Sequence, residues 1–348
     1  MASTDLRCCC GFPYTPFMSQ RAKVVITDFI SDSLDYERRI LGDLADVVAL
    51  NAFSEDALIG RIEDADAIML YHFIGISAKT IGRLQRCRLI VRCGVGYDNV
   101  DHQRARSRGI TVANVPDYGT EDVADSAIGM ALTLARGVHY MNSRLQRREG
   151  PWIYTQVQPT YRLRGRTFGI IGIGRIGTAT ALRAKALGMD VAYYDPYVPQ
   201  GRDKSLGVRS VETLEELLAT SHIVSLHCPN TPETKHMICR QTVSRMRPGS
   251  FLVNTARGAV MDVLAVLDAV TEGHLAGAAI DVLEIEPPVD DHPLMMAWRD
   301  PKHPAHDRII VNPHAAFYSE EGLVDMRLKG SQNCRRVLQG LAPYNVVN

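Results

Sequence analysis

The sequence predicts an α/β protein built from two domains with parallel sheets. Its 348 residues exceed what one ordinary core needs, and they suit two domains of about 150 to 200 residues with a cleft between them. Runs rich in β-branched residues alternate with helix-like segments, and this alternation starts twice along the chain. Small ligands usually bind in clefts of this kind.

The first series of strands precedes a long helical segment. Apolar runs at 22–29, 66–72, 89–94 and 110–116 predict four strands of a parallel sheet. Residues 121–149 are rich in Ala, Leu and Met, contain no proline, and place acids at the start and arginines at the end. They predict one long helix, more than a small domain needs, so part of it is expected to contact a second subunit or to bridge the domains.

The second series begins at Thr167 and predicts a complete doubly wound domain. Six runs read as its strands: TFGIIGIG, MDVAYYD, HIVSLHCP, SFLVNTA, GAAIDVL and RIIVNPH. A closing segment at 319–340 is again helix-like.

A glycine motif follows the first strand of this second series. Gly172, Gly174 and Gly177 form a G-x-G-x-x-G pattern between an apolar run and a helix-like segment. In that context the glycines allow a tight turn, close approach of a pyrophosphate, and tight packing of helix on strand. The exposed N–H groups of the helix then favour phosphate. Arg175 and Ile176 lie inside this loop; Arg175 either contacts a phosphate or is a solvated surface residue.

Asp195 ends the next strand, 18 residues after Gly177. A carboxylate there accepts hydrogen bonds from the two ribose hydroxyls and repels a 2′-phosphate. The motif therefore predicts dinucleotide binding with NAD preferred over NADP, rather than a purely structural turn.

Three polar side chains follow later strands of the same sheet. Arg257, Glu286 and His314 come after SFLVNT, AAIDVL and RIIVNP, and ligands bind outside the carboxyl ends of parallel strands. A histidine suits proton exchange with a hydroxyl, and a guanidinium suits the carboxylate of a 2-oxo or 2-hydroxy acid. A neighbouring carboxylate stabilises the imidazolium form. We therefore expect His314 as acid/base, Arg257 as substrate clamp and Glu286 as the residue that tunes His314; singly, each is equally compatible with a structural role.

The overall composition argues against nucleic-acid binding, membrane association and secretion. Lys plus Arg and Asp plus Glu are both 39, which gives no electrostatic case for binding nucleic acid or an anionic membrane. No run approaches the ~20 apolar residues of a membrane span, and no signal-peptide pattern opens the chain, so a cytoplasmic location is expected. Cys8, Cys9 and Cys10 are expected to be oxidisable tail thiols, and the scattered remaining cysteines read as small buried hydrophobes rather than metal ligands.

The chain resembles the D-2-hydroxyacid dehydrogenase family over almost its whole length. Seven segments are similar to family signatures, in the family's order: RCGVGYDNVD, GIIGIGRIG, YDP, HCPNTPET, MRPGSFLVNTARG, AAIDVLEIEP and PHAA. MLYH, YDPYVPQG and PHAAFYSEE resemble most the C-terminal-binding-protein branch, whose animal members are NAD-sensing corepressors. Those members carry a tryptophan at the position of Phe317, so a wider substrate pocket is expected here.

The resemblance implies a layout and further site residues. It implies two Rossmann-like domains: a discontinuous, flavodoxin-like substrate domain of residues 1–118 and 317–348, and an NAD domain of residues 119–316, with a homodimer formed through the 121–149 region. Backbone amides at Gly94, Val95 and Gly96 would bind the substrate carboxylate. The remaining implied contacts are Cys228, Thr234, Thr255, Ala256 and Asp281 with NAD, and Tyr71 and His72 as pocket walls or, equally, core residues.

Two functions remain open from the sequence. The first is an enzyme that interconverts a 2-oxo acid and a D-2-hydroxy acid with NAD. The second is an NAD(H)-sensing dimeric scaffold with little turnover, which the branch resemblance favours. An intact set of Arg257, Glu286 and His314 favours the enzyme, because a scaffold has no chemical need for all three.

Overall fold

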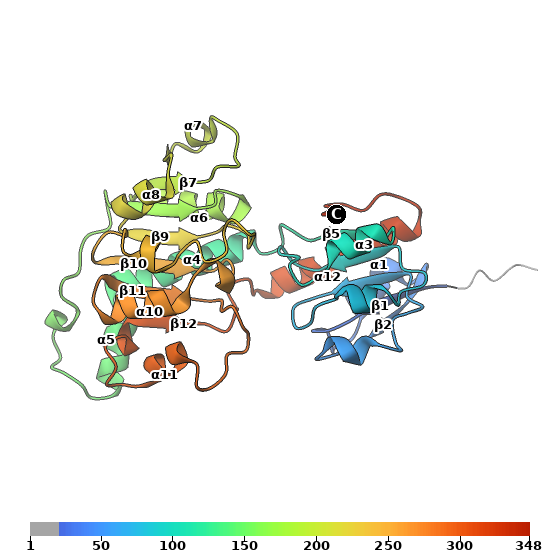
Figure 1. The fold of residues 1–348 in the computed structure, drawn as a ribbon, viewed down its shortest axis with the longest axis horizontal. Coiled ribbons are helices and arrows are strands. Elements are labelled where there is room, and N and C mark those ends of the chain that lie inside the picture. Colours follow the sequence, from blue (N-terminus) through green and yellow to red (C-terminus); the bar gives the residue numbers. More distant parts are fainter. Residues whose placement is uncertain (1–20) are drawn as a thin grey trace, which may run out of the picture. The chain divides into compact units, whose positions relative to one another are not determined.

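The computed structural model describes residues 21–348, so the expected thiols of Cys8 to Cys10 lie outside the described residues. The chain divides into two compact units. In the described chain, unit 1 comprises 21–91, 102–113 and 331–348, and unit 2 comprises 92–101 and 114–330. Each unit contains one sheet (Figure 1).

Unit 1 is built on a five-stranded parallel sheet with the order β2-β1-β3-β4-β5. Its strands are β1 (Ala22–Ile26), β2 (Ala45–Ala49), β3 (Ala67–Leu70), β4 (Leu89–Arg92) and β5 (Thr111–Asn114). Its helices are α1 (Asp35–Leu41), η1 (Glu55–Leu58), α2 (Ala78–Ile81), α3 (His102–Ser107) and the C-terminal part of α12 (Glu320–Leu338). The four predicted strands are present, and β2 is a fifth that sequence reasoning missed.

Unit 2 is built on a seven-stranded parallel sheet with the order β12-β11-β10-β9-β6-β7-β8. Its strands are β6 (Thr167–Ile171), β7 (Asp190–Tyr194), β8 (Arg209–Ser210), β9 (Ile223–Leu226), β10 (Ser250–Asn254), β11 (Leu275–Ile280) and β12 (Ile309–Val311). The chain reverses its direction of winding between β6 and β9, as in a doubly wound fold. The six predicted strands are confirmed. β8 is an additional two-residue strand at the edge of the sheet.

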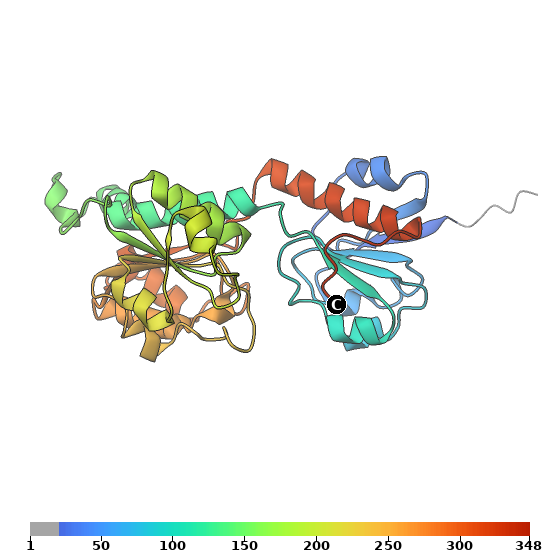
Figure 2. The ribbon, with the colours of Figure 1, turned by 90° about the horizontal axis from the view of Figure 1, so that it is seen from above.

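Helices cover both faces of this sheet (Figure 2). The helices of unit 2 are α4 (Thr120–Arg136), α5 (Val138–Gln146), α6 (Arg175–Ala186), α7 (Arg202–Leu206), α8 (Leu214–Thr220), α9 (Arg240–Val243), α10 (Val263–Thr271) and α11 (Pro293–Arg299), with short turns η2 (Tyr154–Val157), η3 (Gly258–Val260) and η4 (His306–Arg308). One buried cluster packs α4 and α6 against the sheet. A second buried cluster packs α8, α9, α10 and α11 against it. This double coverage explains why strands such as Ile223–Leu226 are buried at every position.

The predicted single helix over 121–149 is wrong. The structure forms α4 and α5, separated by Gly137 at φ 61°. The amide of Gly137 bonds back to the carbonyls of Leu134 and Thr133, which caps α4 in the left-handed conformation that glycine favours. A Cβ on Gly137 would also lie 2.0 Å from Cγ2 of Val157. Composition alone did not reveal the break, because one glycine inside a helical pattern is often tolerated.

Candidate active site

The carboxyl ends of the central strands of unit 2 are aligned. Ile171 pairs with Leu226, Leu226 with Asn254, and Asn254 with Ile280. Ile280 in turn pairs with Val311 of β12. Loops that follow these strands therefore leave the sheet at one edge, the edge where doubly wound proteins bind ligands.

The glycine motif forms the turn between β6 and α6. Gly172 has φ 89°, and a Cβ there would lie 2.8 Å from the amide nitrogen of Cys228. A Cβ on Gly177 would lie 2.0 Å from the carbonyl oxygen of Gly172, so helix and strand pack directly. Gly174 caps α6 and faces open space, with no atom of the described chain within 4 Å of a Cβ. The turn thus leaves room for a phosphate at the start of α6, with Arg175 exposed and Ile176 half-buried on its first turn.

Asp195 orders this turn from the end of β7. Its Oδ2 accepts a hydrogen bond of 2.9 Å from the amide of Ile173, and its Oδ1 accepts one of 3.0 Å from the amide of Tyr197. A carboxylate oxygen has a second lone pair, so Asp195 can still accept from ribose hydroxyls.

The residues predicted to contact the cofactor after β9 and β10 lie in the loops that follow these strands. Oγ1 of Thr255 is buried and has no hydrogen-bond partner within residues 21–348. Burial raises the pKa of the Cys228 thiol to about 11, so this sulfur stays a neutral thiol. Oγ1 of Thr234 closes its own turn, 2.6 Å from the carbonyl of Pro229. The amide of Ala256 donates to Oδ1 of Asn254 at 3.0 Å, which fixes the start of the loop that leads to Arg257.

His314 and Glu286 form a hydrogen-bonded pair. Nδ1 of His314 lies 2.7 Å from Oε2 of Glu286. The amide of Leu283 donates to the other carboxylate oxygen of Glu286 at 2.7 Å. Glu286 is therefore held at both oxygens, and its bond to Nδ1 orients the imidazole of His314.

Asp281 holds the backbone that carries His314. Its carbonyl accepts from the amide of His314 at 2.8 Å, and its carboxylate accepts from the amides of Ala315 and Ala316 at 2.9 to 3.2 Å. Burial raises the pKa of Asp281, and these amides oppose the rise. His314 has φ 52°, a strained conformation for a residue other than glycine. Such strain is typical of functional sites.

Arg257 lies against the loop that follows β4. A Cβ on Gly96 would lie 1.6 Å from Nη2 of Arg257, so only glycine leaves space for the guanidinium. Nε of Arg257 donates to Oδ1 of Asp98 at 3.2 Å. Burial is the largest single influence and would raise the pKa of Asp98, but the charge and hydrogen bond of Arg257, a backbone hydrogen bond and the charge of Arg92 together hold the pKa below its usual range. The side chain of Asn114 donates to the carbonyl of Val95 at 2.6 Å and fixes the same loop.

A second guanidinium and two aromatic rings extend this part of the site. Arg92 is only 8% exposed, and burial lowers its pKa. It also bonds to the side chain of Tyr118, whose pKa is raised by burial. The ring of Tyr118 meets Phe317 edge-on at 6.1 Å, and Phe317 meets His314 in the same way at 6.1 Å. Phe317 thus links the arginine side of the site with the histidine side.

Tyr71 lies in unit 1, at the end of β3. Its ring stacks on Phe29 at 5.7 Å and is 1% exposed. The carboxylate of Asp28 accepts from the amides of Tyr71 and Phe73 at 2.9 and 2.6 Å. Phe29 has φ 71°, again in the left-handed region.

Sequence reasoning missed Asp98, Tyr118 and Asp28. Asp98 lies two residues after Gly96, but its partner Arg257 is 159 residues away. Asp28 is a carboxylate that follows an apolar strand, and this signal marks a candidate without revealing what it binds.

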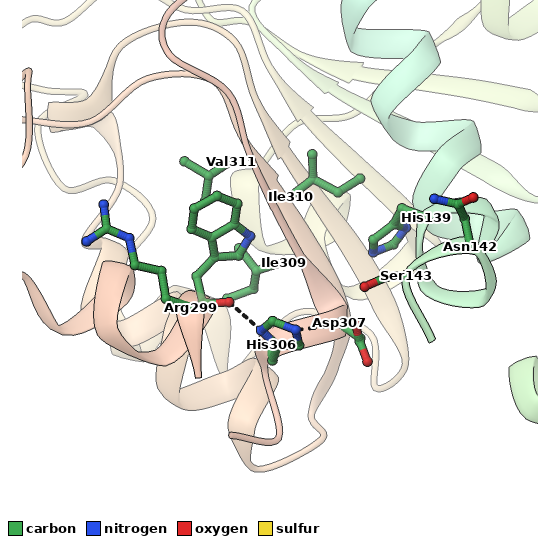
Figure 3. A pocket seen from close by; sticks show the side chains of 10 residues that line it. His139, Asn142, Ser143, Arg299, His306, Asp307, Ile309, Ile310 and Val311 are labelled. Atoms are coloured by element: carbon green, nitrogen blue, oxygen red, sulfur yellow. Dashed lines mark hydrogen bonds and ion pairs between the residues drawn. The ribbon is translucent and has the colours of Figure 1, made fainter. Parts of the chain in front are cut away.

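A separate cavity of about 420 Å³ lies beside β12 (Figure 3). His139 and Ser143 of α5 line one side, and Trp298 and Arg299 of α11 line another. None of the predicted site residues lines it. Asp307, at its floor, pairs with Arg147 at 2.7 Å.

A doubly wound domain with this glycine turn and a polar strand edge is typical of the class of dinucleotide-binding domains. Residues 128–316 match the family of D-isomer specific 2-hydroxyacid dehydrogenases, NAD binding domain. The chain belongs to this family of NAD-dependent 2-hydroxyacid dehydrogenases. No helix within residues 21–348 combines the length and apolar character needed to span a bilayer.

Named relatives support this assignment. The chain is 38% identical over 298 residues to a glyoxylate reductase of Korarchaeum cryptofilum, covering 85% of this chain and 86% of the relative. It is 33% identical over 326 residues to D-3-phosphoglycerate dehydrogenase of Methanocaldococcus jannaschii, covering 94% of this chain but only 59% of that relative. The crystal structure of D-lactate dehydrogenase from Aquifex aeolicus, complexed with NAD and lactic acid, superposes with a TM-score of 0.81 at 28% identity, over 91% of this chain and 96% of that one.

Proposed function

We propose that the chain catalyses the reversible, NAD-dependent interconversion of a 2-oxo acid and a D-2-hydroxy acid. The observation that carries this proposal is the 2.7 Å contact between His314 and Glu286 at the same sheet edge as the glycine turn. When bound, NADH supplies a hydride. The chain supplies proton exchange and substrate binding, which are the two remaining requirements of the reaction.

Each proposed catalytic residue has a defined task. Arg257 binds the substrate carboxylate through its guanidinium, together with backbone amides at Val95 and Gly96. Nε2 of His314 donates a proton to the substrate oxygen in the reductive direction and takes it back in the other. Glu286 stabilises the imidazolium form and, through Nδ1, fixes the tautomer that leaves Nε2 as acceptor.

The cofactor contacts are likewise proposed. The pyrophosphate would be bound by the glycine turn, which comprises Gly172, Gly174 and Gly177 with Arg175 and Ile176. Asp195 would bind the ribose. The rest of the NAD site would be lined by Cys228, Thr234, Thr255 and Ala256. Asp281 would accept a hydrogen bond from the carboxamide of the nicotinamide. The unpartnered Oγ1 of Thr255 supports this assignment.

Turnover tests the proposal. Oxidation of NADH is followed by absorbance with glyoxylate, pyruvate, hydroxypyruvate, phenylpyruvate and 4-methylthio-2-oxobutyrate. We expect at least one of these acids to be reduced to the D-hydroxy product, and the product's configuration is read by chiral chromatography. NADH binding without reduction of any acid would instead support the dimeric scaffold of the C-terminal-binding-protein branch. The dehydrogenase and reductase names of the relatives favour turnover.

We propose Tyr71 as a wall for the substrate's side chain. Its ring belongs to an aromatic cluster with Phe29 and Phe73, in which Phe73 is 56% exposed and meets Phe29 at 5.3 Å. Such a surface suits an apolar side chain more than a second anionic group. Replacing Phe73 with Ala is expected to lower kcat/KM for phenylpyruvate more than for glyoxylate. Phe53→Ala, at a ring 77% exposed in the same unit, is the control.

We also propose a homodimer through the 121–149 region. Val138 lies in this region and is 56% exposed, and Trp152 and Tyr154, shortly after it, are 89% and 71% exposed. α5 also lines the cavity beside β12. Large exposed apolar side chains are candidates for a protein interface. Light scattering should give the mass of two chains, and Trp152→Ser should shift it toward one chain while Phe53→Ser does not. A single-chain mass for the unaltered protein would contradict the dimer.

A further inference from the structure

His236 joins two loops of the site. Its backbone has φ 50°, in the left-handed region. Its amide donates to the carbonyl of Ala259 at 2.8 Å, and its Nε2 lies 3.1 Å from Oε2 of Glu284. One strained residue therefore contacts the turn after Arg257 and the loop that leads to Glu286.

The same two loops also touch through their backbones. A Cβ on Gly258 would lie 1.9 Å from the carbonyl carbon of Leu283 and 2.2 Å from the amide nitrogen of Glu284. The Arg257 turn and the Glu286 loop thus pack with no side chain between them. A small displacement of Leu283 moves the amide that bonds to Glu286 at 2.7 Å.

We propose that His236 is a positioning residue for the Glu286–His314 pair. By bonding Ala259 through its backbone and Glu284 through its ring, His236 holds the 283–286 loop against Gly258. Glu286 then keeps its hydrogen bond to Nδ1 of His314. The catalytic meaning of this inference rests on the proposed function, whereas the structural link does not.

The environment of Glu284 determines how strongly the loss of its bond to His236 should change the reaction rate. Lys235 also approaches Glu284, with Nζ 3.7 Å from Oε1. The side chains of His236 and Glu284 are 44% and 47% exposed. The hydrogen bond from His236 lowers the pKa of Glu284, so the carboxylate is ionised near neutral pH. Since exposed pairs are weak, removing the bond should change rates by only about twofold to fivefold.

Three variants isolate the role of His236. Asn in His236→Asn tolerates the left-handed backbone but is too short to reach Glu284. Glu284→Ala removes the partner. Lys235→Met removes the neighbouring cation and is the matched control. The ring ¹⁵N shifts of His314, measured at about pH 8.5 where free imidazoles are neutral, report which ring nitrogen carries the proton. The readout needs no substrate, and the His314 signals are assigned by their loss in His314→Gln.

We expect the Nδ1–H tautomer of His314 to predominate in the unaltered protein. His236→Asn and Glu284→Ala should each shift it toward the Nε2–H tautomer and lower kcat by about twofold to fivefold, with no further loss in the double variant. Lys235→Met should change neither. Unchanged tautomer populations in both variants, or an equal change in Lys235→Met, would overturn the inference. A tautomer shift in a protein that reduces no 2-oxo acid would uphold it and reject the proposed function.

Discussion

Nδ1 of His314 lies 2.7 Å from Oε2 of Glu286, although 28 residues separate them in the chain. The two residues follow β12 and β11, which are adjacent strands, so the sheet brings them together. This pair is the basis of the proposed acid–base chemistry and of the first prediction.

His314→Ala should lower kcat by about 10²–10⁴-fold, since general acid–base catalysis contributes that much. NADH affinity, measured by calorimetry, should be nearly unchanged because the glycine turn is intact. Glu286→Gln keeps a hydrogen-bond acceptor but loses the charge, so its loss should be smaller. Unaltered kcat in His314→Ala would remove His314 from its proposed role.

Gly96→Ala should displace the guanidinium of Arg257, because the new Cβ would lie 1.6 Å from Nη2. Loss of a charge-assisted hydrogen bond to the substrate should raise KM by about 10- to 100-fold. Phe53→Ala, at a residue that is 77% exposed in unit 1, is the control and should keep the original KM. Equal KM values for both variants would argue against Arg257 as the clamp.

Asp195→Ala should weaken discrimination between NAD and NADP by about tenfold or more, because the carboxylate repels a 2′-phosphate. NAD affinity should also fall, since the amide of Ile173 loses its acceptor. The ratio of kcat/KM for NADH and NADPH is the measurement. A ratio equal to that of the unaltered protein would show that Asp195 does not select the cofactor.

His227→Gln should make stability less sensitive to acid. Burial lowers the pKa of His227 from 6.5 to about 3, so between these values the unfolded chain binds a proton that the folded protein does not. The free energy of unfolding therefore decreases as the pH falls through this window, by up to about 1.4 kcal/mol per pH unit.

Glutamine removes this proton and can still bond to Ser225, which lies 2.9 Å from Nε2 of His227. Denaturation at pH 7.5 and 5.5 should show a smaller loss of stability in His227→Gln, by roughly 1 kcal/mol. Equal losses in the two proteins would contradict the assignment.

Much of the fold was predictable because its signals are local. Apolar runs and intervening helix patterns predicted ten strands, and the structure contains each of them. β2 was missed because ADVVA is a short run interrupted by Asp46, and it lies at the edge of its sheet with only Ala45 fully buried. The helix break at Gly137 was missed because a single glycine inside a helical pattern does not reveal that its backbone is left-handed, with φ 61°.

By itself the sequence determined the family, the glycine turn and the strand-end positions of Arg257, Glu286 and His314, since each depends on residues near one another in the chain. Tertiary structure alone decided which side chains contact one another. Examples are the contacts of Asp98 with Arg257, Tyr118 with Phe317, and His236 with Glu284. The physical reason is that parallel strands bring distant loops to one edge, and contacts between those loops depend on register and packing, which no local pattern encodes.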